Sequence, residues 1–429
     1  MKNIVLTIVT GFISLFSFAQ EIDKVINATE VERIERVLAS DDMKGRKTFT
    51  PDIDRAADFI AAEFSRHQNL KFFGNNNSWF QEFSLVKAKN FSASVKLNNE
   101  NIPTSNFVIT TTSASIETNS TDSWKIIQVK KEDDYSKAIQ SAFEEEKNLL
   151  VLIDTAHAAR FKRLKNFSGR AKFASPYSQV FILTPVSSVN NLEIHASNEL
   201  TEQHLKNVVA VLPGKGKKKQ YVVFSGHYDH LGIGRPDKQM DSLYNGANDD
   251  AAGTTAVMML ADYFSQLKNN KRTLIFVAFT AEEIGGFGSQ YFSKQLNPKK
   301  VKAMFNIEMI GTESKWGINS AYITGYERSD MGKILQSNLE GSAFHFEPDP
   351  YPEQKLFYRS DNATLAQLGV PAHTISTSKM DSEKYYHTPE DEIETLNINN
   401  MAEIIKAIAI SSKTIISGKD TPTRITEKL

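Results

Sequence analysis

A segment of small residues surrounding two adjacent carboxylates raises the first question of chemistry. Residues 245–253 read NGANDDAAG, so Asp249 and Asp250 stand among glycine and alanine. Such a segment offers little side chain for packing, yet its backbone and carboxylates can come close to a small cation. Two aspartates at a helix start are also a common N-cap with acidic first-turn residues. A metal site is therefore favoured only if other segments supply further ligands.

Three apolar runs that read as strands end in ionisable residues. In chain order, the runs 221–226, 273–279 and 303–310 deliver His227, the pair Glu282 and Glu283, and Glu308. The carboxyl ends of strands form the ligand crevice of an open α/β sheet, so we expect these side chains at one edge. In that company the adjacent pair Asp249 and Asp250 is better interpreted as the source of a carboxylate that bridges two cations than as a helix cap.

The remaining ligand candidates are ranked by their position. His227 directly follows its strand and is favoured over His230 as a metal ligand, and Asp229 is placed to orient its imidazole. Neighbouring residues of an extended chain point in opposite directions, so one of the two adjacent glutamates can bind metal while the other stays free as a base. His387, in the loop segment YYHTPED, would supply a second imidazole.

Alternating strands and helices must position these residues. Strands are expected at 207–212, 221–224, 273–279, 303–310, 321–324 and 372–376, and helices at 28–42, 52–69, 251–267 and 397–416. Continuous apolar strands that alternate with helices indicate a sheet covered on both faces. The pattern predicts an α/β sandwich, with a catalytic domain formed by residues 20–87 and 196–429.

Residues 88–195 differ from the rest of the chain in their sequence pattern. Strand-like runs such as 93–97 and 149–153 alternate with breaks rich in Asn, Ser and Thr. Few ionisable residues cluster there with the spacing of metal ligands. We interpret this region as an inserted, mostly β module without chemistry of its own.

Composition limits the classes of protein and of site. The 429 residues contain 50 Lys plus Arg against 51 Asp plus Glu, a balance that argues against a nucleic-acid-binding protein. The sequence has no cysteine, which excludes disulfides, thiolate metal ligands and a lipid anchor on a cysteine. Any metal must be held by histidines and carboxylates, a set that suits Zn²⁺, with Mn²⁺ or Co²⁺ as alternatives.

The first nineteen residues read as a secretory signal peptide. Lys2 is followed by an apolar run over 4–18, and SFA at 17–19 has small residues at both positions that signal peptidase reads. A membrane anchor is the weaker interpretation, because the run is shorter than the ~20 residues that a span needs. We expect an exported bacterial protein, periplasmic or secreted, without membrane attachment after cleavage and acting as a monomer or small homo-oligomer.

Taken in order, these segments resemble the co-catalytic di-zinc aminopeptidases of clan MH, a group that also contains glutamate carboxypeptidases, glutaminyl cyclases and the transferrin-receptor ectodomain. The resemblance rests on MKGRKT near the N-terminus and, within residues 205–416, on SGHYDHLG, NGANDDAAGT, FTAEEIGGFGS, FNIEMIGT, RSDN and YYHTPED. It implies a three-layer sandwich with a mixed, mostly parallel central sheet. The insert stands where many members carry a protease-associated domain.

The resemblance also implies a role for each site residue. Five residues would hold two divalent metal ions, expected to be zinc: His227 and Glu308 one ion, Glu283 and His387 the other, and Asp249 both. Glu282 would be the general base, Asp229 would orient a ligand imidazole, and Tyr386 would steady the developing oxyanion. The implied reaction is removal of N-terminal residues from peptide substrates.

Two positions depart from the family pattern. Glu308 replaces the usual aspartate and could alter metal preference or the pocket for the substrate's amino group, and Asn362 replaces a histidine that is not normally a ligand. Arg359 is interpreted either as part of a substrate pocket or as an exposed structural arginine. The alternatives to an aminopeptidase are a single-zinc glutaminyl-peptide cyclotransferase, a carboxypeptidase or dipeptidase of the same clan, and a non-catalytic binding module.

Overall fold

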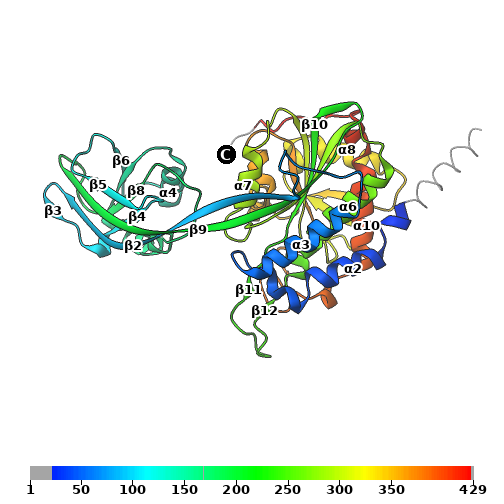
Figure 1. Ribbon diagram of the computed structural model, residues 1–429, viewed down its shortest axis with the longest axis horizontal. Coiled ribbons are helices and arrows are strands. Elements are labelled where there is room, and N and C mark those ends of the chain that lie inside the picture. The colour runs from blue at the N-terminus through cyan, green and yellow to red at the C-terminus, as the bar shows by residue number, and fades with distance from the viewer. Residues whose placement is uncertain (1–21, 168, 427–429) are drawn as a thin grey trace, which may run out of the picture. The chain divides into compact units, whose positions relative to one another are not determined.

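The computed structural model describes residues 22–167 and 169–426, and the signal peptide predicted at residues 1–19 lies outside them. The described chain divides into two compact units, drawn in Figure 1. One unit takes the described residues up to Glu82 together with Leu205 and those that follow it, and the other is Phe83–His204.

The first unit is built on a mixed, mostly parallel sheet. Its strand order is β16-β15-β17-β14-β10-β13-β9, with the bounds His345–Pro348, Ser320–Ile323, Ala372–Ser376, Val301–Ile307, Lys217–His227, Arg272–Phe279 and Leu192–Leu212. β10 pairs in parallel with β13 and β14, β14 with β17, and β15 with β16. β9 is antiparallel to β13, and β15 is antiparallel to β17. The sequence analysis anticipated each of these strands except β16. The short strand β1 (Lys71–Phe72) pairs with β9, and β11 (Gly232–Ile233) pairs with β12 (Leu243–Tyr244).

Helices cover both faces of this sheet (Figure 1). The larger apolar core contains side chains from α2 (Ala28–Leu38), α3 (Pro51–Ser65), α6 (Ala252–Leu267), α8 (Met331–Asn338), α10 (Ile398–Ser411) and α11 (Lys413–Ser417). The smaller core, on the opposite face, contains side chains from α7 (Phe287–Lys294) and α9 (Asn362–Ala366). This three-layer arrangement confirms the predicted fold class.

The central strand β10 shows how alternation builds the two cores. Phe224 belongs to the larger core and its neighbour Val223 to the smaller one, because successive side chains of a strand point to opposite faces. The Phe224 ring stacks on Phe276 of β13 and Phe305 of β14, with centroids 5.5 and 4.9 Å away. Truncating such a buried phenylalanine to alanine typically costs about 3–5 kcal/mol of stability. The three strands that end at the candidate site are thereby fixed against one another.

Helix boundaries differ from the expected ones for local reasons. The helix expected at 28–42 ends at Leu38, because the next turn is a 3-10 segment in which Lys44 and Gly45 have left-handed φ angles of 46° and 66°. Pro51 stands at the start of α3, where its missing N–H costs nothing. The final helix expected at 397–416 is divided at Ser412 into α10 and α11.

The second unit contains a four-stranded sheet in the order β4-β8-β7-β6. Its elements are β2 (Phe80–Leu97), β3 (Glu100–Asn101), β4 (Phe107–Thr110), β5 (Ser115–Thr118), β6 (Lys125–Val129), β7 (Leu149–Ile153), β8 (Gln179–Leu183), α4 (Tyr135–Glu144) and α5 (Ala158–Leu164). The boundaries expected at 88 and 195 lie inside this unit. Its two helices were not anticipated, and both contribute to a core with β7.

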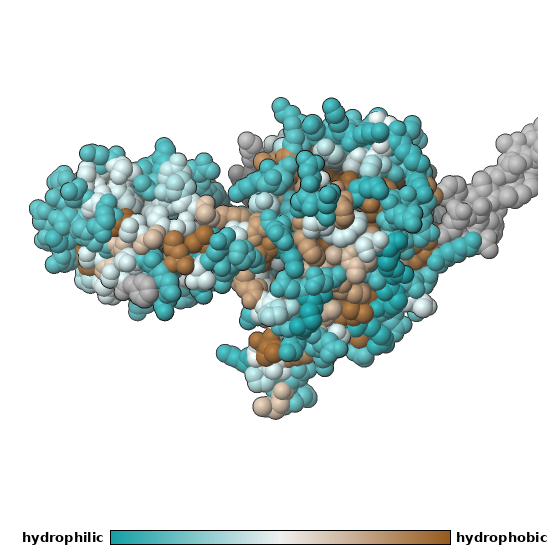
Figure 2. Space-filling view, viewed as in Figure 1, coloured by the Kyte–Doolittle hydropathy of each residue, from teal (hydrophilic) through white to brown (hydrophobic). Residues whose placement is uncertain are grey.

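The visible surface of each unit is mostly hydrophilic (Figure 2). Large exposed apolar side chains include Ile233 in β11 and Met240 in the loop before β12, which are 60% and 78% exposed. Within residues 22–167 and 169–426, no helix has the length and apolar composition needed to cross a membrane.

Candidate metal centre

Three adjacent parallel strands bring the strand-end residues to one edge of the sheet. β10 lies between β13 and β14, and its last residue, His227, pairs with Phe279 at the end of β13. Glu282 and Glu283 follow β13 after two intervening residues, and Glu308 directly follows β14. The carboxyl ends of these strands therefore present an imidazole and three carboxylates side by side.

The loop before α6 delivers Asp249 to the same edge. The peptide that joins Asp249 to Asp250 is cis. A Cβ added to Gly253 would collide with a carbonyl oxygen at the end of β14, and one added to Gly246 would collide with the ring of His230. The small residues of NGANDDAAG thus have a packing role that the sequence analysis did not foresee, because they let the loop lie directly against the strand ends.

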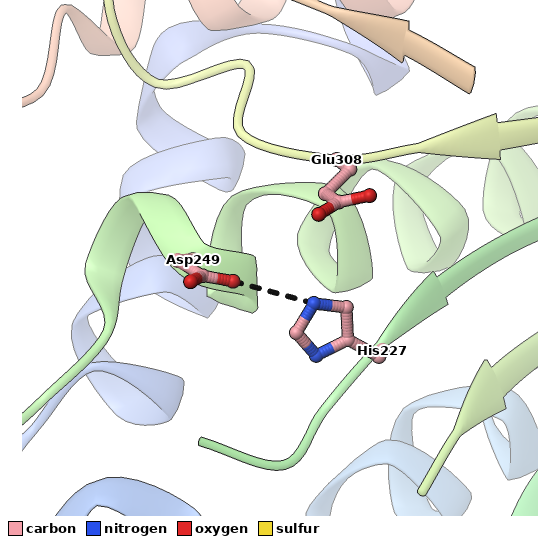
Figure 3. Close-up of side chains that lie close together, drawn as sticks. All are labelled: His227, Asp249 and Glu308. Atoms are coloured by element: carbon pink, nitrogen blue, oxygen red, sulfur yellow. Dashed lines mark ion pairs between the residues drawn. The ribbon is translucent and has the colours of Figure 1, made fainter. Parts of the chain in front are cut away.

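His227, Asp249 and Glu308 form one group of converging ligands (Figure 3). Nε2 of His227 lies 3.3 Å from Oδ1 of Asp249. One ligand atom from each of the three residues lies within 4.8 Å of the others, a spacing that can surround a single metal ion.

Asp249 also belongs to a second group. Nε2 of His387 lies 3.2 Å from Oδ2 of Asp249 and 3.3 Å from Oε2 of Glu283. Nδ1 of His230 lies 2.8 Å from Oε1 of Glu283 and 3.9 Å from Oδ2 of Asp249. The structure therefore brings together all five residues that the sequence analysis named as ligands. It adds His230, which the sequence analysis had ranked below His227.

The donor atoms of both groups fit a cation. Among the residues that the structure describes, Nε2 of His227, both ring nitrogens of His230 and Oε1 of Glu283 are buried without a hydrogen-bond partner. Buried polar atoms normally have partners, so lone pairs that converge without one are suited to an ion. Imidazole nitrogens and carboxylate oxygens are the ligands that zinc takes where thiolates are absent.

The pKa shifts of the candidate ligands in the metal-free site also indicate that this site suits a cation. Burial alone would raise the pKa of Asp249, but the imidazoles of His227 and His387, with Nε2 atoms 3.3 and 3.2 Å from its carboxylate oxygens, hold it well below its usual range. Burial opposes the charged form of His387, yet its hydrogen bonds with Asp249 and Glu283 raise its pKa to about 10. A bound cation takes the place of such protons, so metal binding here releases them.

Glu282 belongs to neither ligand group. Its backbone N–H donates to Oδ1 of Asp229 at 3.0 Å, and its side chain lines the pocket beside the ligands. Burial, together with the negative charges of Glu308 and Asp361, raises the pKa of Glu282 well above its usual value despite the opposing effect of His227. The Glu282 carboxyl group is therefore not one of the candidate metal ligands, and in the metal-free site its raised pKa favours the protonated form.

The backbone is strained next to two of the site carboxylates. Ala281, just before Glu282, has a φ angle of 61°, and Met309, just after Glu308, has a φ angle of 51°. Non-glycine residues adopt this left-handed region at a cost of about 1–3 kcal/mol, and such residues gather at functional sites. At both strand ends the chain turns out of the strand direction, and Glu282 and Glu308 line the pocket as a result.

Asp229 was expected to orient His227 with its carboxylate, but it contacts the imidazole through its backbone carbonyl instead. Nδ1 of His227 lies 3.1 Å from the carbonyl oxygen of Asp229 and 3.8 Å from its carboxylate oxygen Oδ1. The carboxylate accepts hydrogen bonds from the backbone N–H groups of Glu282 and Glu283, at 3.0 and 3.3 Å. One residue thus positions the imidazole with its main chain and both glutamates with its side chain.

Asp250 links the loop to two strand ends, a role that sequence reasoning missed. Its carboxylate accepts hydrogen bonds from the backbone N–H groups of His227 and Met309, both at 3.1 Å, and of Gly253 at 3.0 Å. Nothing in the adjacent pair of aspartates indicated which one would face the ligands and which would hold the backbone.

Arg46 is a second positioning residue that the sequence did not reveal. Its buried guanidinium donates to the carbonyl oxygens of Tyr228, Leu38, Asn245 and Gly246, at 2.9, 2.6, 2.6 and 2.8 Å. It therefore fixes the chain on both sides of the metal ligands. Its only signal in the sequence was the segment MKGRKT, which contributed to the family resemblance but indicated no role for Arg46.

Comparisons with known proteins agree with this geometry. Residues 207–411 match the model described as Peptidase family M28. This region belongs to peptidase family M28. Aminopeptidase YwaD of Bacillus subtilis (strain 168) is 26% identical over 216 residues, 46% of this chain and 42% of that protein. Leucine aminopeptidase 1 of Emericella nidulans is 29% identical over 210 residues, 47% of this chain and 53% of that protein. The chain thus spans about half the length of these curated M28 relatives.

Solved structures share the fold over more of the chain. The aminopeptidase from Aneurinibacillus sp. strain AM-1 matches with a TM-score of 0.53 and 16% identity, covering 95% of this chain and 97% of that one. A zinc aminopeptidase from Bacillus subtilis matches with a TM-score of 0.54 and 16% identity, covering 94% and 98%. At this level of identity the similarity shows a common fold.

A pocket adjoins the candidate metal centre. Besides the metal ligands, its lining includes Tyr322, Leu356, Arg359, Met380 and Tyr386. The Tyr386 ring is stacked on the His387 ring with centroids 3.9 Å apart, which places its phenol beside the ligands. Arg359 is exposed and lines the same pocket, so its position is compatible with the substrate-pocket interpretation.

The two departures from the M28 pattern have different surroundings. Glu308 lies in the ligand group with His227 and Asp249, so its longer side chain still reaches the centre. Asn362 is buried outside the pocket lining, where it donates to the carbonyl oxygens of Phe357 and Ala372 at 2.8 and 3.2 Å. The replacement of histidine at this position is therefore a packing change behind the site.

Proposed function

We propose that this protein is an exported aminopeptidase that uses two zinc ions. The observation that supports it best is the pair of ligand groups that share Asp249 at the carboxyl edge of the sheet. M28 membership of residues 207–411 and the aminopeptidase names of the curated relatives support the same activity.

The side chains divide into two sets for the two ions. His227 and Glu308 would hold one ion, Glu283 and His387 would hold the other, and Asp249 would contribute one carboxylate oxygen to each. When bound, two such ions polarise the scissile carbonyl and lower the pKa of a water molecule. The unpartnered buried lone pairs of this site supply the ligands that such a pair of ions requires.

Glu282 is proposed as the general base. The Glu282 side chain lines the pocket beside the candidate ligands without belonging to either ligand group, so a carboxylate oxygen is placed to take up a proton from the attacking water. The same oxygen then hands the proton to the nitrogen of the leaving amine. Because Asp229 holds the Glu282 backbone through a 3.0 Å hydrogen bond, this carboxylate is oriented independently of the metal ligands.

Tyr386 is proposed to stabilise the oxyanion. Burial, followed by the negative charges of Asp249 and Glu283, raises the pKa of Tyr386 above its ordinary value, so its phenol stays protonated. A protonated phenol in the pocket can donate a hydrogen bond to the oxygen that gains charge as the carbonyl is attacked.

The pocket is suited to a free amino terminus. Glu282 and Glu308 line it together with Asp249, so carboxylate oxygens that can accept hydrogen bonds lie where the substrate binds. A free α-amine can donate to such oxygens, whereas acetylation removes a donor and adds an acyl group. We therefore propose peptides with a free N-terminus as the substrates.

The decisive experiment compares aminoacyl-nitroanilides with their N-acetyl derivatives before and after treatment with a chelator. We expect hydrolysis of the free-amine substrates only, loss of activity with the chelator and recovery with Zn²⁺. Equal hydrolysis of the acetylated compounds would exclude an aminopeptidase, and a metal content of one ion per chain would favour the cyclotransferase alternative.

Export is proposed from residues 1–19 alone. A bacterial host that secretes the protein should yield a mature chain that begins at Gln20. N-terminal sequencing of the recovered protein tests this, and a retained Met1 would contradict it.

A further inference from the structure

His230 is buried at the metal centre with no function assigned to it so far. Its side chain is fully shielded from solvent, yet within the described chain neither of its ring nitrogens has a hydrogen-bond partner. An imidazole always carries at least one N–H or lone pair that seeks a partner. The surroundings of this ring therefore need an explanation other than packing.

The ring faces the second ligand group. Nδ1 of His230 lies 2.8 Å from Oε1 of Glu283, which is close enough for a hydrogen bond, but both atoms lack one. Because these two atoms are not aligned for a hydrogen bond with each other, both can turn a lone pair toward a shared cation. One ligand atom from each of His230, Glu283 and Asp249 lies within 4.8 Å of the others.

His387 approaches the same point from the other side. Its Nε2 lies 3.3 Å from Oε2 of Glu283, and its ring meets the His230 ring edge-on, with centroids 5.7 Å apart and planes at 69°. Each oxygen of the Glu283 carboxylate thus has one imidazole beside it. With Asp249, this second group has four protein ligands, whereas the group of His227, Asp249 and Glu308 has three.

We infer that His230 is an additional ligand of the ion held by Glu283, His387 and Asp249, so that the two metal positions of this enzyme are unequal. The inference rests on the proposed two-metal function. Four protein ligands make a closed site of the kind that binds zinc tightly, whereas three leave a position open for water or substrate. The position that contains His230 therefore fills first and releases its ion last.

The test is a titration of the metal-free protein with Zn²⁺ and with Co²⁺ for the wild type and the variant His230→Gln. Wild type should bind two ions in separate steps. In His230→Gln the tighter step should weaken by at least about tenfold, and the visible absorption of the Co²⁺ protein should change because one nitrogen ligand is lost. X-ray absorption of the zinc protein should show fewer imidazole ligands per ion.

Glutamine also separates a ligand from a positioning residue. Its side-chain amide can still donate a hydrogen bond to Glu283, so a His230 that only oriented Glu283 would be rescued by this variant. The control is His157→Gln, which alters a buried histidine of the second unit whose Nε2 lies 2.8 Å from the carbonyl oxygen of Lys130. It should leave both metal affinities and the Co²⁺ spectrum unchanged.

The outcomes are distinguishable. If His230→Gln bound two ions with wild-type affinities and an unaltered Co²⁺ spectrum, the inference would be overturned while the proposed function stood. If the wild-type protein bound no metal, the proposed function itself would fail. Comparing thermal unfolding of the metal-free proteins shows whether the variant folds, and a loss of metal affinity with unchanged metal-free unfolding supports the ligand role.

Discussion

Asp391 holds the backbone of Asp249 in place. Its Oδ2 accepts the backbone N–H of Asp249 at 3.0 Å, while its Oδ1 accepts that of Asn248 at 2.8 Å. The residue proposed to be shared by two ions is thus fixed from behind by a carboxylate far along the chain. Asp391 lies in the segment YYHTPED, which also contains His387, so the same loop supplies a ligand and holds the bridging residue.

Replacing Asp391 with asparagine should therefore weaken metal binding. The amide has one acceptor oxygen where the carboxylate has two, so one of the two backbone N–H groups loses its partner. Residues that orient metal ligands typically contribute about 10–100-fold to metal affinity. Competition with a chromogenic chelator measures this, with the exposed Glu394→Gln as the control. Unchanged affinity in Asp391→Asn would contradict the positioning role.

Arg46→Met should destabilise the whole first unit as well as the centre. The change removes the guanidinium donor from four buried carbonyl oxygens. That of Gly246 keeps the backbone N–H of Ala251, and each buried group left unsatisfied costs about 1–3 kcal/mol. We expect a fall of several kcal/mol in the free energy of unfolding, measured with urea. Arg36→Met, at an exposed position on α2, is the control and should lie within about 0.5 kcal/mol of wild type. Equal stabilities of the two variants would show that Arg46 is dispensable.

Glu282→Gln should retain metal but lose activity. The amide keeps the size of the side chain and cannot take up a proton, so kcat should fall by at least about 10²–10⁴-fold. KM for aminoacyl-nitroanilides and the zinc content should stay near their wild-type values. Glu353→Gln, at an exposed carboxylate outside the pocket lining, serves as the matched control. A Glu282→Gln enzyme with near wild-type kcat would remove Glu282 from the mechanism.

Glu35 should make stability depend on pH. This carboxyl is fully buried in α2, where its Oε2 accepts the Thr255 hydroxyl at 2.7 Å, and burial raises its pKa to about 8 from an ordinary 4.5. The native state therefore binds this proton more tightly than the unfolded chain does. Its contribution to stability is fully present below pH 4.5 and is lost as pH rises through about 8.

The variant Glu35→Gln removes that titration. Its free energy of unfolding should therefore increase relative to wild type as pH rises across the window from 4.5 to about 8. Urea unfolding at several pH values in this window measures the difference. Glu32→Gln, on the exposed side of the same helix, should run parallel to wild type. Parallel curves for Glu35→Gln as well would mean that Glu35 is already ionised in the native state.

The sequence predicted the parts of the fold that depend on local pattern. Each of the strands that end at His227, Phe279 and Ile307 is an apolar run, and the ionisable residues that follow stand out against it. α6 was anticipated from the spacing of its apolar residues. α7 was not, because it is short and begins in a glycine-rich segment that reads as a loop.

The convergence of the five candidate ligands was predictable because metal ligands must be imidazoles or carboxylates when cysteine is absent. The residues that position these ligands were not predictable, because positioning depends on contacts between segments that are distant in the sequence. Arg46 reaches Gly246, and Asp250 reaches Met309, through backbone groups whose location no side-chain pattern records. For the same reason the burial of His230 between the loop and Glu283 could not be read from its place three residues after His227.

Part of the pocket lining comes from segments that supply none of the candidate metal ligands. The candidate metal ligands come from the sheet edge, the Asp249 loop and His387, whereas Leu356 and Met380 line the pocket from other segments and are not ligand candidates. A library randomised at these two positions should alter which peptides are cleaved and leave zinc retention intact. Engineering of selectivity can thus begin there without disturbing the reactive chemistry.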